Sequence, residues 1–289
     1  MYFISLSYYT ISVDFIKILR TSRPPVWICH WCLLFYGGLQ NPSFNPLDYK
    51  FLITLFVFSL PFSLCVYAFN DYYDRESDSL NPRKTSLFGE RHTTKTIKRL
   101  KTWSFAGFGI SIFLMSFVNV YALLGLVLLV IGSILYSSSV TRFKSIPIVD
   151  AIAGGGCYFY LTTVTGFLVF LNGRLQIADI IQPAFIVLTL VGIVGQSMAI
   201  VADEKPDKAQ HINTSSVLFG SNAVITVCIT LLGICLYLVR TNMIFSGFIL
   251  VLAFLCSLFY WGAWRTNKYM QVSGGFYFPF IFLLVSVLL

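Results

Sequence analysis

Four acidic residues stand within eight positions, from Asp71 to Asp78, directly after the apolar segment 51–69. With Asn70 in front, the stretch reads Asn-Asp-Tyr-Tyr-Asp-Arg-Glu-Ser-Asp. On a helix, Asp71, Asp74 and Asp78 would share one face, because residues three, four and seven apart are neighbours on the helix surface. Carboxylates this close repel one another, and a bound divalent cation relieves the repulsion. The stretch therefore predicts a metal site.

A second acidic cluster, residues 203–207, follows another apolar segment and reads Asp-Glu-Lys-Pro-Asp. Asp203 and Asp207 would share a face if the helix continues through Pro206, a residue that usually breaks helices. The two clusters hold seven of the 12 acidic residues. One such cluster could be a solvated helix end, but two, each followed by basic residues, favour a binding site.

Magnesium suits this donor set, since it takes hard oxygen ligands and commonly joins carboxylates to substrate phosphates. We expect two Mg²⁺ ions to hold a diphosphate between the two clusters. Nearby cations would neutralise charge on a leaving diphosphate. The candidates are Arg83, Lys84, Arg142, Lys144 and Lys208. With an apolar cavity beneath, such a site could ionise an allylic diphosphate and shelter the carbocation from water.

The elements that must position these residues are membrane helices. The 289 residues are 57% hydrophobic and only 11% charged, with a mean hydropathy of +0.78, which excludes an ordinary soluble domain. A search for apolar segments that could cross a bilayer finds nine spans. They are residues 26–39, 51–69, 103–118, 120–136, 148–171, 180–202, 223–239, 244–263 and 274–289.

Basic residues are distributed very unequally between the two sides that nine spans define. The N-terminal segment and the loops after even-numbered spans hold 17 Lys and Arg residues, whereas the other side holds three. This asymmetry places the N-terminus and both acidic clusters in the cytoplasm of an integral, multi-pass membrane protein. It also explains the net charge of +8 through contact with anionic membrane lipids, without a nucleic-acid partner.

Other reactive residue types have simpler interpretations. The seven cysteines lie in or beside apolar segments and are interpreted as small core residues, including the CxxC pair Cys29 and Cys32. The glycines 154–156 suggest close helix packing or cavity space. His92 belongs to a basic run typical of a solvated, lipid-facing surface, and His211 to a solvated loop. For Asp150, pairing with Arg142 or Lys144 is favoured over direct catalysis.

Together, these motifs resemble the UbiA superfamily of intramembrane prenyltransferases. Residues 70–78 match its NDxxDxxxD signature and residues 203–207 its DxxxD signature, and the resemblance spans nearly the whole chain. It implies a barrel-like bundle of nine helices around a central cavity, an isoprenyl diphosphate donor and a lipophilic acceptor. The implied metal and diphosphate ligands are Asn70, Asp71, Asp74, Asp78, Asp203 and Asp207, with Arg83, Lys84, Arg142 and Lys144 on diphosphate oxygens. Arg23 and Tyr136 are similar to family positions near that site.

Further stretches look like the lycopene elongase branch, which adds dimethylallyl units to lycopene in carotenoid biosynthesis. They are residues 22–27, 81–84, 136–137, 142–150 and 206–207. Residues 85–89 lack the expected glycine-rich continuation, and Lys205 stands where an acid is common. We therefore keep a quinone precursor, a chlorophyllide and a glycerol phosphate lipid as alternative acceptors. A membrane transporter is the alternative from another class, although its acids would lie nearer the bilayer midplane.

The resemblance also implies a domain organisation. We expect a single transmembrane prenyltransferase domain over residues 1–289, beginning with a short amphipathic segment, 1–22, along the membrane surface. Two loops, at about 70–101 and 203–221, would cap the cytoplasmic end of the cavity.

Overall fold

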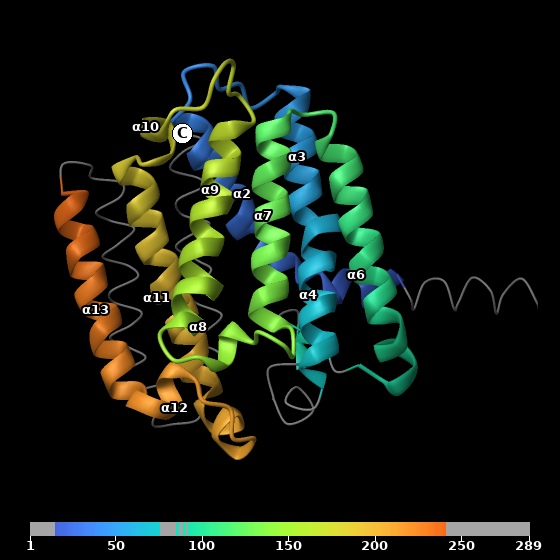
Figure 1. Ribbon diagram of the computed structural model, residues 1–289, viewed down its shortest axis with the longest axis vertical. Coiled ribbons are helices and arrows are strands. Elements are labelled where there is room, and N and C mark those ends of the chain that lie inside the picture. Colours follow the sequence, from blue (N-terminus) through green and yellow to red (C-terminus); the bar gives the residue numbers. More distant parts are fainter. Residues whose placement is uncertain (1–14, 76–84, 87–88, 91, 241–289) are drawn as a thin grey trace, which may run out of the picture.

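The computed structural model describes residues 15–75, 85–86, 89–90 and 92–240. Long helices run side by side through this part of the chain (Figure 1). They are α2 (Pro24–Leu39), α3 (Tyr49–Ser59), α4 (Pro61–Tyr73), α6 (Thr94–Met115), α7 (Val120–Ser137), α9 (Tyr158–Leu168), α11 (Pro183–Ala209) and α13 (Ser221–Leu238). Shorter elements connect them: η2 (Phe143–Ser145), α8 (Val149–Ala151), the π-helix η3 (Ile152–Cys157), α10 (Ile177–Ile180) and α12 (Ser215–Phe219). A two-residue antiparallel pair, β1 (Thr85–Ser86) and β2 (Gly89–Glu90), precedes α6.

Five helical segments of the described residues are long and apolar enough to cross a membrane. They are Tyr49–Tyr73, Val120–Ser137, Val149–Leu168, Pro183–Ala209 and Ser221–Leu238. The spans predicted at 26–39 and 103–118 form α2, which has only 16 residues, and α6, which begins with a basic turn. The spans predicted at 244–263 and 274–289 lie outside the described residues. An all-helical membrane protein is thus confirmed, and the count of nine spans stays a prediction.

The second predicted span is interrupted in its middle. Helix α3 ends at Ser59, and α4 begins at Pro61. Proline has no backbone N–H and cannot continue the hydrogen-bond ladder of the preceding turn. The last carbonyl groups of α3 therefore need other partners. One of them, the carbonyl of Phe58, lies 2.8 Å from Nδ1 of His30 on α2.

The two acidic clusters end up on helices of different kinds. Helix α4 ends at Tyr73, and Asp74 is its C-cap residue. Asp78 itself lies outside the described residues. In contrast, α11 continues through Pro206 to Ala209, which places Asp203 and Asp207 one turn apart on one helical face.

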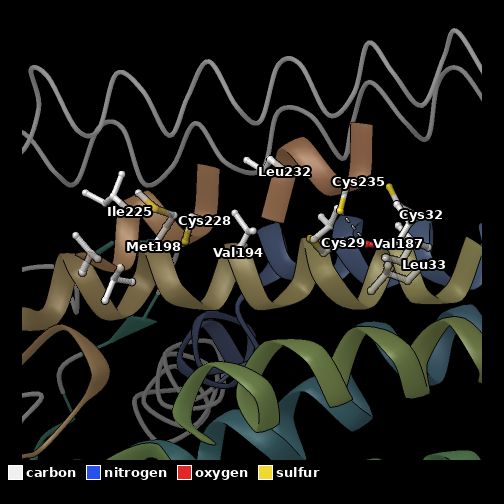
Figure 2. Close-up of a cluster of buried hydrophobic side chains, with 14 residues drawn as sticks. Cys29, Cys32, Leu33, Val187, Val194, Met198, Ile225, Cys228, Leu232 and Cys235 are labelled. Atoms are coloured by element: carbon white, nitrogen blue, oxygen red, sulfur yellow. Dashed lines mark hydrogen bonds between the residues drawn. The ribbon is translucent and has the colours of Figure 1, made fainter. Parts of the chain in front are cut away.

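A large apolar core joins α2, α11 and α13 (Figure 2). Its cysteines Cys29, Cys32, Cys228 and Cys235 are buried as free thiols, which confirms the interpretation of these four as core residues.

Behind this core, η3 packs against α11 at a pair of glycines. A Cβ atom on Gly155 would collide with the backbone oxygen of Gly192. The glycine run therefore allows close helix packing, as the sequence suggests.

The ends of the helices that carry the acidic clusters lie together. The C-terminal ends of α4 and α11 reach the same end of the bundle as α8 and α12, at the bottom of Figure 1. Helix α10 lies at the opposite end. The fold thus gathers the C-terminal ends of α4 and α11 and the segment 143–151 after α7 at one end of an apolar bundle.

Candidate active site

Asp71, in the last turn of α4, is 1% exposed and binds two basic groups. Nη2 of Arg23 donates to Oδ1 at 2.8 Å, and Nε2 of His92 lies 2.9 Å from Oδ2. A carboxylate only accepts, so Nε2 carries the proton in this contact. Arg23 precedes α2 with a left-handed backbone, φ 52°. Such strain in a non-glycine residue persists where the surroundings hold it, often at functional sites.

The neighbouring Asp74 is 8% exposed and forms an ion pair with Lys144 of η2. Burial lowers the pKa of the Lys144 ammonium to about 8, while the negative charges of Asp207 and Asp71 act in the opposite direction. Lys144 therefore lies in the electric field of carboxylates from both acidic clusters. The loop after α7 is the segment that brings the two clusters into one electrostatic environment.

The second cluster is more open. Asp203 and Asp207 are half-buried on α11, whereas Lys205 and Lys208 are exposed. The intervening Glu204 accepts a hydrogen bond from the hydroxyl of Ser221, at the start of α13. This contact fixes the position of α11 relative to α13 beside the two aspartates.

Several buried polar atoms near the carboxylates have no hydrogen-bond partner in the described structure. They are Nε of Arg142, Nδ1 of His92 and Oγ of Ser145. Arg142 also has a left-handed backbone, φ 41°, at the start of η2. The Arg142 and Ser145 atoms can donate, whereas Nδ1 of a neutral His92 ring is an acceptor. Unsatisfied buried polar groups are costly, and such groups often await a ligand. Donors beside carboxylates suit a phosphate group accompanied by a hard cation.

The donor set fits Mg²⁺ in its chemistry, since Asp71, Asp74, Asp203 and Asp207 all offer carboxylate oxygens. Within the described residues, no three His, Cys, Asp or Glu side chains lie close enough together to hold a metal ion. Asp71 and Asp74 bind Arg23, His92 and Lys144 in this structure. The predicted residues Asp78, Arg83 and Lys84 lie outside the part of the chain that the structure describes.

Two further residues of the predicted site, Tyr136 and Asn70, lie at the end of α7. Tyr136 belongs to α7, and Asn70 belongs to α4. Asn70 donates from Nδ2 to Oγ of Ser137 at 3.1 Å, which ties α4 to α7. The hydroxyl of Tyr136 accepts a hydrogen bond from Nε2 of Gln196 at 2.8 Å. A Cβ atom on Gly154 would stand 2.7 Å from the Tyr136 ring, so only glycine leaves room for this ring.

Asp150 has different partners from those predicted. Its side chain is fully buried, and it accepts hydrogen bonds from the backbone N and Oγ of Ser215 at 2.7 and 2.6 Å. Ser215 Oγ in turn accepts from the backbone N of Ile148 at 2.7 Å. The prediction that Asp150 pairs with Arg142 or Lys144 is therefore corrected: Asp150 joins the loop after α7 to α12, which follows the second cluster.

The prediction of a solvated side chain holds for His211 but is wrong for His92. His211 is exposed, as expected, and has φ 56°. The side chain of His92 is only 5% exposed and contacts Asp71, so it is not part of a solvated surface. The sequence offered no local signal for this contact, because 21 residues separate the two side chains.

The chain is similar in sequence to known proteins. The model of the UbiA prenyltransferase family matches residues 26–285. A lycopene elongase/hydratase of Corynebacterium glutamicum is 26% identical over 227 residues, covering 78% of this chain and 76% of that protein. A protein of the same name from Haloarcula japonica is 26% identical over 232 residues, covering 73% and 70%.

Solved structures show the same fold. A UbiA homolog from Archaeoglobus fulgidus, bound to GPP and Mg²⁺, superposes with a TM-score of 0.70 at 17% identity, covering 93% of this chain and 99% of that one. The apo structure of a UbiA homolog from Aeropyrum pernix K1 gives a TM-score of 0.70 at 14% identity, covering 91% and 98%.

Proposed function

This chain belongs to the UbiA prenyltransferase family, and from that premise we propose that it transfers a dimethylallyl group to a carotenoid such as lycopene. The observation that supports the donor site most strongly is the position of Lys144, which pairs with Asp74 and lies in the field of Asp71 and Asp207. It matches the chemistry of a diphosphate bound with a hard cation.

The donor diphosphate would bind at the polar end of the bundle, with its prenyl chain directed into the apolar interior. Asp71, Asp74, Asp203 and Asp207, together with Asp78, would hold two Mg²⁺ ions. When bound, Mg²⁺ supplies Lewis-acid polarisation of the leaving diphosphate. Lys144 would exchange its contact with Asp74 for a phosphate oxygen.

The basic residues then carry the charge that develops as the C–O bond breaks. Arg142 and Lys144 offer donors from the loop after α7, and Arg23 offers them from the start of α2. Fixed donors in a site that excludes water stabilise such charge without reorganising. Arg83, Lys84, Lys208, Asn70 and Tyr136 complete the proposed diphosphate site. The allylic cation is attacked by an electron-rich carbon of the acceptor.

The acceptor is proposed from the relatives. The proteins from Corynebacterium glutamicum and Haloarcula japonica are both called lycopene elongase/hydratase. A related structure from Archaeoglobus fulgidus is bound to DMAPP and Mg²⁺. A quinone precursor, a chlorophyllide and a glycerol phosphate lipid are the alternative acceptors. The acids at one end of the bundle favour the enzyme over an ion-coupled carrier.

We also propose the orientation and organisation expected from the sequence. The polar end faces the cytoplasm, since 17 of the 20 Lys and Arg residues belong to that side. Residues 1–289 act as one transmembrane domain, and the loops at about 70–101 and 203–221 cap the site.

To test this proposal, the purified protein would be incubated with labelled dimethylallyl diphosphate or labelled geranylgeranyl diphosphate. Each donor would be combined with lycopene or with one of the alternative acceptors. We expect Mg²⁺-dependent transfer of the dimethylallyl group to lycopene. Transfer to another acceptor alone would replace the carotenoid assignment. Full transfer in the presence of a chelator would contradict the metal-dependent mechanism.

A further inference from the structure

A chain of polar side chains leads from the site into the middle of the bundle. It begins at Tyr67, one helical turn before Asp71 on α4, and continues through Tyr158 of α9 to His30 of α2. The side chains of Tyr67 and Tyr158 lie next to each other, close enough to interact. The hydroxyl of Tyr158 lies 2.7 Å from Nε2 of His30, which is 1% exposed. Ionisable residues inside a membrane helix are costly and commonly functional.

The protonation of His30 follows from its partners. Nδ1 lies 2.8 Å from the carbonyl oxygen of Phe58, and a carbonyl can only accept. Nδ1 therefore carries the proton of the neutral ring, and Nε2 is the acceptor that faces Tyr158. The carbonyl is available because Pro61 interrupts the span. Ser63 donates to the same carbonyl at 2.9 Å. The helix break thus fixes His30 as a proton acceptor.

The chain begins directly below the proposed diphosphate site. One helical turn, about 5 Å, separates Tyr67 from Asp71, so both lie on the same face of α4. The guanidinium of Arg23 stands 4.2 Å from the centroid of the Tyr67 ring while it donates to Asp71. His30 lies seven residues beyond Arg23 along α2, about 10 Å deeper. A prenyl group that hangs from the diphosphate would pass Tyr67 and Tyr158.

Aromatic rings enclose the inner end of this chain. The imidazole of His30 has ring centroids of Phe58, Phe62 and Tyr158 at 5.9, 5.8 and 5.6 Å. The rings of Phe62 and Tyr158 are stacked at 6.0 Å. Aromatic faces attract cations and keep water away. The surroundings of His30 suit a cationic intermediate that must lose a proton before water reaches it.

We propose that Tyr158 and His30 form the proton acceptor that ends prenyl transfer, with Tyr67 orienting Tyr158. This inference rests on the proposed function. The electron pair of the acceptor's terminal alkene forms the new C–C bond to the allylic cation and leaves a tertiary carbocation. A C–H bond next to that cation breaks, and its electrons form the product alkene. The proton goes to the Tyr158 oxygen, whose own proton passes to Nε2 of His30. Water that enters on product release then removes the proton.

The alternative fate of the same carbocation supplies the test. If no base takes the proton, water adds to the cation and gives a hydroxylated product. We would compare wild type with Tyr158→Phe and His30→Gln, using dimethylallyl diphosphate and lycopene, and measure alkene product, hydroxylated product and released diphosphate. In both variants we expect alkene formation to fall about a hundredfold. The hydroxylated share should rise, and diphosphate release should stay within about threefold of wild type.

Tyr160→Phe is the matched control, two positions along the same helix. Its hydroxyl donates to the carbonyl of Ile180 at 3.0 Å, away from His30. This variant should keep the wild-type product ratio. An unchanged ratio in Tyr158→Phe and His30→Gln, a uniform loss of both products, or a wild type that forms only hydroxylated product would overturn the relay. A wild type that transfers no prenyl group would instead overturn the proposed function.

Discussion

Asp71 and Asp74 lie buried where α4 ends, whereas Asp203 and Asp207 lie half-buried within the continuous helix α11. The first pair is held by partners from three other segments: Arg23 before α2, His92 before α6 and Lys144 between α7 and α8. Through these contacts, the first pair holds several segments of the bundle together. The second pair lies one turn apart on a single helix and is more exposed than the first.

Because of this difference, substitutions in the two pairs should have different effects on turnover and on the stability of the bundle. A change in the first pair should remove a metal ligand and also leave buried basic groups without their counter-charge. Because the second pair is half-buried, a change there should affect the chemistry and lower the stability of the bundle less than a change in the first pair. The following variants test that distinction.

The largest effect is expected from Asp71→Asn. The amide cannot replace a carboxylate on Mg²⁺, so turnover should fall about a thousandfold or more. Because Arg23 and His92 lose their acceptor charge, the melting temperature in detergent should fall as well. Asp207→Asn is the comparison: it should lose turnover but keep a melting temperature close to wild type. Equal losses of stability in the two variants would remove the distinction between the pairs.

A smaller effect is expected at the lysine that both pairs influence. Lys144→Met should lower kcat/KM for the donor about a hundredfold, because a buried charge next to the leaving diphosphate is lost. Lys98→Met is the control, since Lys98 is exposed on α6, has no place in the proposed diphosphate site and should change kcat/KM by no more than about threefold. Similar losses at both positions would argue against a special role for the loop after α7. Steady-state kinetics with varied donor would show the difference.

The contact between Asp150 and Ser215 should affect the site only indirectly, through the position of a neighbouring loop. Asp150→Asn cannot accept both hydrogen bonds from Ser215, so the loop that carries Arg142 and Lys144 should be less well positioned. We expect KM for the donor to rise about tenfold with little change in kcat. A loss confined to kcat would indicate direct participation of Asp150 in the chemistry.

The smallest effect is expected at His92. His92→Gln can still donate to Asp71, so activity should stay within about threefold of wild type. His92→Leu removes the donor and should be clearly less active. If both variants were equally impaired, His92 would be needed for more than this hydrogen bond. Initial rates at saturating donor are sufficient for the comparison.

Much of the fold could be predicted because the length of each apolar segment can be read directly from the sequence. The spans predicted at 120–136 and 223–239 end within two residues of α7 and α13 at both ends. The sequence was less informative where polar residues extend a helix beyond its apolar segment. Helix α6 begins at Thr94 and α11 ends at Ala209, in both cases within a charged stretch. Hydropathy does not register these turns.

The site was predictable in its acidic residues but not in its contacts. The pairing of Asp71 with His92 and of Asp150 with Ser215 joins residues 21 and 65 positions apart, which no local pattern encodes. The contact between His30 and the carbonyl of Phe58 depends on where a proline interrupts a span. These features arise from the packing of helices, and spacing along the chain does not specify them.

Binding of one donor molecule by both aspartate pairs is the central claim, and a non-ionisable thiolo analogue of dimethylallyl diphosphate tests it most directly. Calorimetric titration of this analogue into purified wild type, Asp71→Asn and Asp207→Asn, with Mg²⁺ or with a chelator, separates binding from turnover. We expect saturable binding to wild type that requires Mg²⁺ and is lost in each variant. Binding that persists with the chelator, or that Asp207→Asn leaves unchanged, would contradict it.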